Sequence, residues 1–263
     1  MLLSAQEITM RFGGLTAVDR FSFSLEEGDL VGLIGPNGAG KTTVFNMVSG
    51  SLKPTEGRIL FQEQDIAGLK ANLITRRGIA RTFQNIRLFQ DMTVLENVMI
   101  SHHGRLRSTF LDAVLMTPRY LHEERDMEEG SLRLLRRVRL EGVAREKAGG
   151  LAYGQQRRLE IARALAAKPR LLLLDEPAAG MNPQETEDLM EFILQVKNDF
   201  GLTILLIEHD MRLVMGICRR IYVLDYGALI AEGTPEQIQN NPKVIEAYLG
   251  EEQTQGPSGE NLA

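Results

Sequence analysis

Residues 35–43 decide the fold of this chain, and they read Gly35-Pro36-Asn37-Gly38-Ala39-Gly40-Lys41-Thr42-Thr43. The apolar run before them, residues 30–34, predicts a buried strand, and residues 44–48 after them can open a helix. A strand, a glycine-rich loop ending in Lys-Thr and a helix form the context of a phosphate-binding P-loop. The alternative is a glycine-rich turn that carries a surface lysine. The fixed spacing and the preceding strand favour the P-loop.

A P-loop binds phosphate mainly through its backbone. Glycines let successive N–H groups turn inward around phosphate oxygens, and the helix N-terminus adds unpaired N–H groups and a positive dipole end. We expect Lys41 to reach the β- and γ-phosphates of a nucleotide and the Thr42 hydroxyl to ligate Mg²⁺.

The composition sets broad limits on what the protein does. The chain has 263 residues, of which 43% are hydrophobic and 25% charged, and its net charge of −5 gives no general reason to expect nucleic-acid binding. The single cysteine, Cys218, excludes an internal disulfide and a Cys-based zinc site. The first residues lack the pattern of a signal peptide, and no apolar run approaches the roughly 20 residues of a spanning helix. We therefore expect a soluble protein that can sit against a membrane protein.

Polar residues follow three further predicted strands, at residues 79–83, 171–174 and 203–207. In open parallel sheets, ligands bind beyond the carboxyl ends of the strands. Gln84 follows the first strand and is placed to touch the metal or the attacking water; taken alone it would be a surface glutamine. Asp175 and Glu176 follow the second, and His209 follows the third.

These strand ends suggest distinct chemical roles. We expect Asp175 to hold Mg²⁺, directly or through water, and Glu176 to polarise the attacking water. His209 could hydrogen-bond the γ-phosphate. An acidic turn is the alternative for the two carboxylates, but adjacent carboxylates need a cation or solvent, and the P-loop supplies a reason for Mg²⁺.

The rest of the chain surrounds this unit. Residues 8–25 and 58–61 predict a β-rich layer, whereas residues 85–150 predict a helical insertion. Phe12 stands before a Gly-Gly turn, where an exposed ring could stack on adenine; the alternative is a core phenylalanine. Residues 251–263 are polar with Gly and Pro, and we expect them to be disordered.

A second anion-binding feature lies at residues 151–165, which predict a helix that begins near Gly154. Its N-terminus is again suited to an anion. Because the P-loop helix already serves the phosphates, a second such helix suggests a composite site shared between two copies.

Together, these segments resemble the ATP-binding cassette of ABC transporters, in order and spacing, over almost the whole chain. The matching segments are Gly35–Thr43, Gln84, Leu151–Gln155, Leu171–Glu176 and His209. The resemblance implies an α/β fold: a P-loop, RecA-like core with an antiparallel β subdomain (residues 1–84 and 154–250 together) and a helical subdomain with the signature region (residues 85–153). It also implies a head-to-tail dimer that binds two ATP molecules between the P-loop of one subunit and the signature helix of the other.

The resemblance assigns roles to individual positions. Phe12 would stack on adenine, Gln84 would belong to the Q-loop, Glu176 would be the catalytic glutamate and His209 the switch histidine. Gln84 would also touch the metal. The signature residues facing the partner's nucleotide would be Ala152, Tyr153, Gly154 and Gln155.

Two departures from the family pattern stand out. The usual signature is Leu-Ser-Gly-Gly-Gln, and here Ala152 and Tyr153 replace Ser and Gly, so a serine hydroxyl near the partner's γ-phosphate is lost. After Glu176 the usual Ser-Ala-Leu-Asp is replaced, and Asn182 stands where Asp is common. Hydrogen bonding between subunits is expected to differ there.

The departures indicate a subfamily. Several segments resemble the ATPase subunits of branched-chain amino-acid importers of the LivG type: 10–14, 81–84, 87–89, 151–160, 208–211, 240–242 and 247–250. This implies a peripheral protein on the cytoplasmic face of the inner (plasma) membrane that hydrolyses ATP to power separate transmembrane permease subunits. The partners would be those permeases, a second copy or a related ABC ATPase, and indirectly an external solute-binding protein.

Other functions share parts of the pattern. Related ATPases import urea or amides or export lipopolysaccharide. A soluble ABC ATPase acting on DNA or ribosomes usually carries a long coiled coil or two cassettes, and this sequence has neither heptad runs nor a second P-loop. A GTPase or kinase would share the P-loop but would leave residues 151–155 without an explanation.

Overall fold

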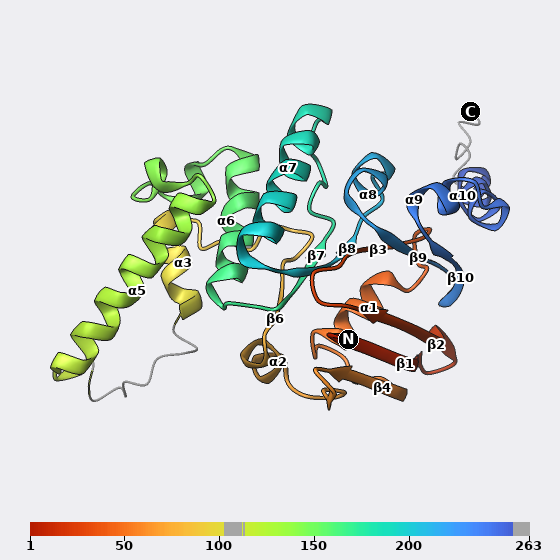
Figure 1. Cartoon of the computed structure of the whole chain (residues 1–263), viewed down its shortest axis with the longest axis horizontal. Coiled ribbons are helices and arrows are strands. Elements are labelled where there is room, and N and C mark those ends of the chain that lie inside the picture. The colour runs from red at the N-terminus through yellow and green to blue at the C-terminus, as the bar shows by residue number, and fades with distance from the viewer. Residues whose placement is uncertain (103–111, 113, 255–263) are drawn as a thin grey trace, which may run out of the picture.

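The P-loop strand lies in the middle of a six-stranded sheet (Figure 1). The computed structural model describes residues 1–102, 112 and 114–254. The strand order is β10-β9-β3-β8-β7-β6, parallel from β9 to β6, with β10 antiparallel at one edge. The strands are β3 (Leu30–Ile34), β6 (Ile79–Arg81), β7 (Leu171–Asp175), β8 (Thr203–Ile207), β9 (Arg220–Asp225) and β10 (Ala228–Gly233).

The central strands are buried on both faces, as their continuous apolar sequences predict. All five residues of β3, β7 and β8 are buried. Within β7, Leu171 and Leu173 pack into one hydrophobic cluster, whereas Leu172 and Leu174 pack into another. The sheet therefore separates two cores, one on each face.

The first core is closed by a second, antiparallel sheet of order β2-β1-β4-β5. Its strands are β1 (Leu3–Phe12), β2 (Leu15–Leu25), β4 (Glu56–Phe61) and β5 (Gln64–Asp65). Helices α1 (Lys41–Val48) and α2 (Ala71–Arg77) contribute to the same core. The rings of Phe21 and Phe23 stack at 5.0 Å and meet Tyr222 of β9 edge-on.

The second core is closed by helices on the opposite face of the six-stranded sheet. They are α3 (Val94–His102), α5 (Pro118–Arg137), α6 (Tyr153–Ala166), α7 (Pro183–Phe200) and α8 (Met211–Ile217), followed by α9 (Pro235–Gln239) and α10 (Pro242–Thr254). Short 3-10 turns lie at Glu141–Val143 and Ala148–Gly150. Figure 1 shows α3, α5 and α6 as a helical part beside the sheet, with α9 and α10 at the other side.

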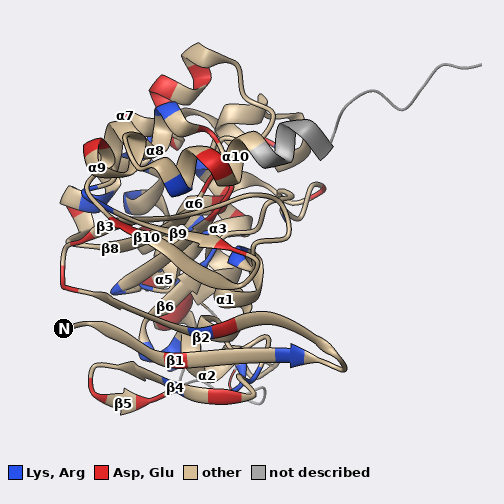
Figure 2. Cartoon of the chain, turned by 90° about the vertical axis from the view of Figure 1, so that its right-hand side faces the viewer, with Lys and Arg blue, Asp and Glu red and all other residues tan. Residues whose placement is uncertain are grey.

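Charges of both signs are spread over this framework. Figure 2 shows Lys and Arg residues interspersed with Asp and Glu residues on the side that faces the viewer. Among the described residues, no helix combines the length and apolar character needed to cross a bilayer.

Two boundaries differ from the sequence-based expectation. The strand predicted at residues 79–83 ends at Arg81. Thr82 still donates its N–H to the carbonyl of Leu173, but the N–H of Phe83 turns to the carboxylate of Glu160, so the ladder stops there. The predicted start of the disordered tail at residue 251 is too early, because residues 251–254 continue α10. Glu and Gln, which favour helices, fill most of that turn. Residues 255–263 lie outside the described residues.

Candidate functional site

The P-loop, residues 35–40, leaves the carboxyl end of β3 and enters α1. Gly35, Gly38 and Gly40 adopt positive φ angles of 147°, 77° and 100°. A Cβ on Gly35 would lie 2.0 Å from the carbonyl oxygen of Leu224, and one on Gly40 would lie 2.5 Å from that of Ala17. Neighbouring strands therefore press on the loop so closely that only glycine fits at these two positions.

The loop carries the groups expected for phosphate binding. The Nζ of Lys41 is buried in the loop and donates to the carbonyls of Gly35 (2.6 Å) and Pro36 (2.8 Å). Helix α1 begins at Lys41 without a side-chain cap, which leaves its first N–H groups available to an anion. Thr42 follows as an exposed residue in the first turn, with Thr43 beside it.

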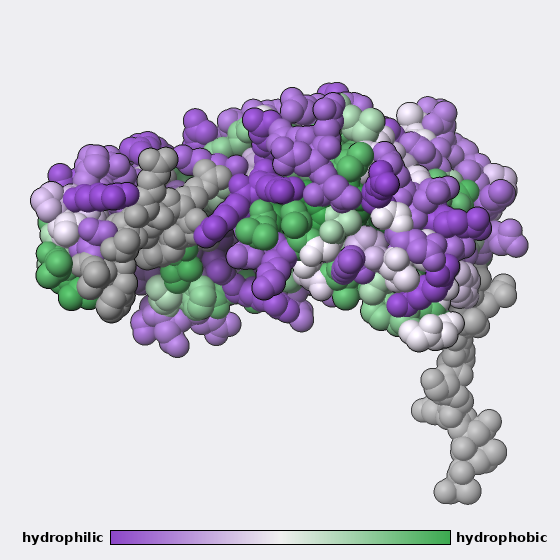
Figure 3. All heavy atoms as spheres, turned by 90° about the horizontal axis from the view of Figure 1, so that it is seen from below, coloured by the Kyte–Doolittle hydropathy of each residue, from purple (hydrophilic) through white to green (hydrophobic). Residues whose placement is uncertain are grey.

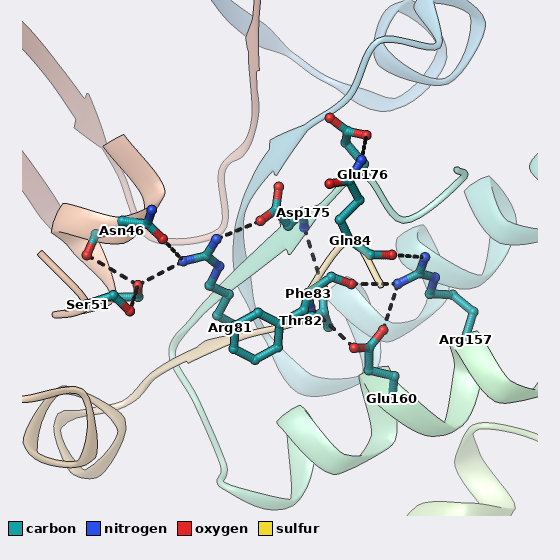
Figure 4. A network of polar contacts seen from close by, with 11 residues as sticks. Asn46, Ser51, Arg81, Thr82, Phe83, Gln84, Arg157, Glu160, Asp175 and Glu176 are labelled. Carbon is teal, nitrogen blue, oxygen red and sulfur yellow. Dashed lines mark hydrogen bonds and ion pairs between the residues drawn. The ribbon is translucent and has the colours of Figure 1, made fainter. Parts of the chain in front are cut away.

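The residues predicted to act on the attacking water and the γ-phosphate, Gln84, Glu176 and His209, meet at the carboxylate of Glu176. Figure 4 shows the contact between Gln84 and Glu176. The Nε2 of Gln84 donates to the Oε2 of Glu176 at 2.7 Å, and the Nδ1 of His209 lies 3.5 Å from the same oxygen. They come from the ends of β6, β7 and β8, which are adjacent in the sheet. Parallel strands thus bring together Gln84 and His209, which are 125 positions apart in the sequence.

Glu176 is held in an unusual backbone conformation. Its φ is +44°, a left-handed value that costs energy for a residue with a side chain. The neighbouring Glu208, which sequence reasoning left unused, fixes this turn: its buried carboxylate accepts the N–H of Ala178 at 2.7 Å and that of His209 at 3.1 Å. Burial raises the pKa of Glu208, which the backbone hydrogen bonds oppose. One side chain therefore ties the segment after Glu176 to the segment that carries His209.

Asp175, the predicted metal ligand, has a cationic partner that the sequence did not reveal (Figure 4). The Nη2 of Arg81 lies 2.7 Å from its Oδ2, and both side chains are nearly buried. The Nη1 of Arg81 donates to the Oδ1 of Asn46 on α1 at 2.6 Å. Arg81 therefore connects the end of β7 to the P-loop helix.

The signature residues lie on another face. Helix α6 begins at Tyr153 after Ala152, both exposed, and Gly154 and Gln155 continue its first turn. Helix α6 packs in the core on one face of the six-stranded sheet, whereas α1 packs in the core on the other. The fold thus packs the two helices whose N-termini are predicted to bind anions on opposite faces of the sheet.

Tyr153 makes a contact within its own chain. Its hydroxyl donates to the carbonyl of Ala179 at 2.7 Å. Asn182, in the other departure from the family pattern, caps α7: its side chain accepts the N–H of Glu185, whose carboxylate accepts the N–H of Asn182. The pattern Asn-Pro-x-Glu could have revealed this capping box from the sequence.

Phe12 is the last residue of β1, directly before the turn to β2, and is 47% exposed. An exposed ring on a hairpin tip has no core to fill, so the alternative of a core phenylalanine is wrong. Its contact with adenine stays a prediction.

An apolar groove of about 520 Å³ lies next to the residues that follow Gln84. Its apolar walls include Phe83, Leu88, Phe89, Ala164 and Ala167, and charged side chains, among them Arg87 and Arg163, also line it. Phe89 is 48% exposed. Figure 3, the view from below, shows apolar surface gathered near the middle of this side, beneath α2 and β6, within hydrophilic surroundings.

The sequence profile of the ABC transporter family matches residues 18–179, from β2 through the turn after Glu176. The chain belongs to the ABC transporter family. A second profile, described as the branched-chain amino acid ATP-binding cassette transporter, matches residues 228–254 of this ABC ATPase.

Individual relatives agree over nearly the whole chain. The high-affinity branched-chain amino acid transport ATP-binding protein LivG of Escherichia coli (strain K12) is 51% identical over 250 residues, covering 95% of this chain and 98% of the relative. The structure of the ADP conformation of MJ1267, an ATP-binding cassette of an ABC transporter, matches with a TM-score of 0.84 and 35% identity, covering 95% of this chain and 98% of that one.

A solved structure with lower sequence identity is a dimer. The dimeric structure of MJ0796, described as a bacterial ABC transporter cassette, matches with a TM-score of 0.73 and 26% identity, covering 89% of this chain and 99% of that one. The predicted α/β cassette fold is confirmed. The protein is an ATPase whose hydrolysis of ATP is coupled to transport.

Proposed function

We propose that this ABC ATPase powers import of branched-chain amino acids (leucine, isoleucine and valine) through separate membrane permease subunits. The observation that carries the proposal is the match of residues 228–254 to the branched-chain amino acid cassette profile, joined to the high identity with LivG. The protein would work as a peripheral subunit at the cytoplasmic face of the membrane, and an external solute-binding protein would deliver the amino acid to the permease.

ATP binds along the carboxyl edge of the sheet in this proposal. Backbone N–H groups of residues 35–43 surround the phosphates, Lys41 leaves its carbonyl partners to meet the β- and γ-phosphates, and Phe12 stacks on adenine. This exchange of partners is favourable because the ammonium of Lys41 gains an anionic phosphate in place of two neutral carbonyls.

Mg²⁺ would be held together with the nucleotide. In the described part of the chain, no cluster of three or more His, Cys, Asp or Glu residues could hold a metal by itself. The hydroxyl of Thr42, the carboxylate of Asp175 and the amide oxygen of Gln84 are the hard donors that Mg²⁺ takes beside substrate phosphates. The donor set therefore fits, and when bound the ion neutralises charge on the β- and γ-phosphates.

Glu176 acts as the general base. Its carboxylate accepts the proton of the attacking water, while the amide of Gln84 and the imidazole of His209, both next to Oε2, orient the water and the γ-phosphate. The reaction converts ATP and water to ADP and phosphate.

A second subunit completes the site. The N-terminus of α6, with Ala152, Tyr153, Gly154 and Gln155, faces the γ-phosphate on the P-loop of the partner in a head-to-tail dimer. The separation of α1 and α6 on opposite faces of the sheet supports this arrangement, and so does the dimer of the related cassette. The partner is a second copy or a related ABC ATPase.

The apolar groove beside the Q-loop receives the permease. A short helix from a permease subunit would place apolar residues between Phe83, Leu88 and Phe89. Because Gln84 lies between Phe83 and Leu88, which both line this groove, movement of the docked helix and rearrangement at Glu176 become coupled.

The test is uptake of labelled leucine by cells that lack this chain. Wild type should restore uptake, and Glu176→Gln should not, although the purified variant should still bind ATP and lose hydrolysis by orders of magnitude. Glu191→Gln, the same change at an exposed position of α7, is the matched control and should restore uptake.

Other results would redirect the proposal. Normal leucine uptake without this chain, with ATPase activity in the purified protein, would reject the amino-acid substrate and move the search to urea, amides or lipopolysaccharide. Hydrolysis by Glu176→Gln at the wild-type rate would reject its role as base. Stimulation of hydrolysis by DNA or ribosomes instead of permease would favour a soluble ABC ATPase.

A further inference from the structure

Arg157, on the second turn of α6, is the largest fully buried side chain among the residues that the structure describes. Its two terminal nitrogens have four partners. Nη1 donates to the carbonyl of Phe83 (2.9 Å) and to the Oε2 of Glu160 (2.7 Å), and Nη2 donates to the carbonyl of Gln84 (3.0 Å) and lies 3.5 Å from the hydroxyl of Tyr153. The planar fork of a guanidinium thus spans two consecutive carbonyls of the Q-loop.

Glu160 grips the same backbone from the other side (Figure 4). Its Oε1 accepts the N–H of Phe83 at 3.3 Å while its Oε2 pairs with Arg157. Burial raises the pKa of Glu160, and the adjacent guanidinium opposes that shift. The pair therefore binds one N–H and two C=O groups, which are the groups that β6 no longer pairs after Thr82.

This clamp determines where the side chain of Gln84 begins. Gln84 and most of the residues after it, up to residue 90, are exposed, so packing alone does not fix them. With its carbonyl bound to Arg157, Gln84 extends its amide toward Glu176 and donates to Oε2 at 2.7 Å. A displacement of the backbone by about 1 Å would break this bond, and errors of that size lower catalytic rates strongly.

We propose that Arg157, supported by Glu160, is a positioning residue for ATP hydrolysis, which locks the Q-loop backbone onto the signature helix so that Gln84 meets Glu176. This inference rests on the roles proposed above for Gln84 and Glu176. It adds a physical link: rotation of α6, whose N-terminus serves the partner's nucleotide, pulls directly on the Q-loop of its own subunit.

The test replaces the buried pair together. Arg157→Met alone would leave the buried carboxylate of Glu160 without a cationic partner. The main variant is therefore Arg157→Met with Glu160→Met, which fills the space with apolar atoms and leaves no unpaired charge. Arg157→Lys is the second variant, since it keeps the charge but loses the fork. Arg133→Met, on an exposed arginine of α5 that also pairs with a glutamate, is the control.

The double variant should bind ATP like wild type, with a KM within about threefold, and its kcat should fall by about 10- to 100-fold. Arg157→Lys should lie between, and Arg133→Met should match wild type. Backbone amides of residues 83–90 should exchange with solvent faster in the double variant, because their anchor is gone.

A double-mutant cycle with Gln84→Ala distinguishes a positioning role of Arg157 from a general loss of structure. If Arg157 acts through Gln84, adding the pair replacement to Gln84→Ala should lower kcat no further, whereas independent effects would multiply. Multiplied effects, or an unchanged kcat in the double variant, would overturn the proposal. If the double variant does not fold, the same cycle with Arg157→Lys decides. Wild-type hydrolysis by Gln84→Ala and Glu176→Gln would instead reject the proposed site itself.

Discussion

Replacing Gly35 with alanine should distort the P-loop before any nucleotide binds. The new Cβ would lie 2.0 Å from the carbonyl oxygen of Leu224 in β9, and a carbon–oxygen contact needs about 3.3 Å. Loop and strand must therefore part by more than about 1 Å. Overpacking of this kind costs about 1–3 kcal/mol. The φ of 147°, which alanine rarely adopts, adds about 1–3 kcal/mol.

Gly38→Ala is the matched control in the same loop. Its φ of 77° is also positive, but a Cβ there meets nothing within 4 Å. We expect it to cost about 1–2 kcal/mol from the left-handed backbone alone. Gly35→Ala should cost about 4 kcal/mol, the sum of its strain and its overpacking.

Urea unfolding of both variants without nucleotide, followed by far-UV circular dichroism, measures the difference in free energy of unfolding. Equal losses in the two variants would refute the contact between the P-loop and β9 as the source of the cost.

Three further predictions concern single side chains. Cys218 is an acid whose pKa rises from 9.0 to about 12 on burial, so the native state keeps its proton longer than the unfolded chain does, and stability should fall as the pH rises from 9 toward 12. Cys218→Ala should lose less free energy of unfolding between pH 8.5 and 10.5 than wild type, by roughly 1–2 kcal/mol; parallel pH profiles would contradict this. Asn182→Ala should destabilise the protein by about 1 kcal/mol and Asn182→Asp should not, because only alanine removes the cap of α7; equal urea midpoints for the two would count against the capping box. Arg81→Met should cost about 3–5 kcal/mol, because Asp175 is then buried without its cation; a loss below about 1 kcal/mol, the value typical of exposed pairs, would show that the pair is not a buried one.

Much of the fold follows from local sequence patterns. The runs at 30–34, 171–174 and 204–207 are continuous and apolar, and a strand with that pattern has to be covered on both faces. Because such strands are parallel, the residues after them share one edge, which is why Gln84, Glu176 and His209 meet.

The sequence did not predict that the charged side chains of Arg81 and Arg157 are buried. An arginine in a short strand or on an amphipathic helix normally points to solvent, and only the folded chain shows that Arg81 and Arg157 point inward. The spacing of Arg157 and Glu160 predicts an ion pair on a helix but not its burial, which depends on the Q-loop backbone packed against it. The contact of Tyr153 with Ala179 likewise joins segments whose approach no local pattern encodes.

The position of β3 in the sheet has a consequence for how the protein is made. Its two neighbours, β8 and β9, lie about 170–190 positions later in the chain. While the ribosome is still adding those residues, the P-loop strand has neither partner, and Leu224, which presses on Gly35, does not yet exist. A nascent chain should therefore be unable to bind ATP until β8 and β9 have been synthesised. Fragments that end before β8 and β9 are therefore expected not to bind ATP.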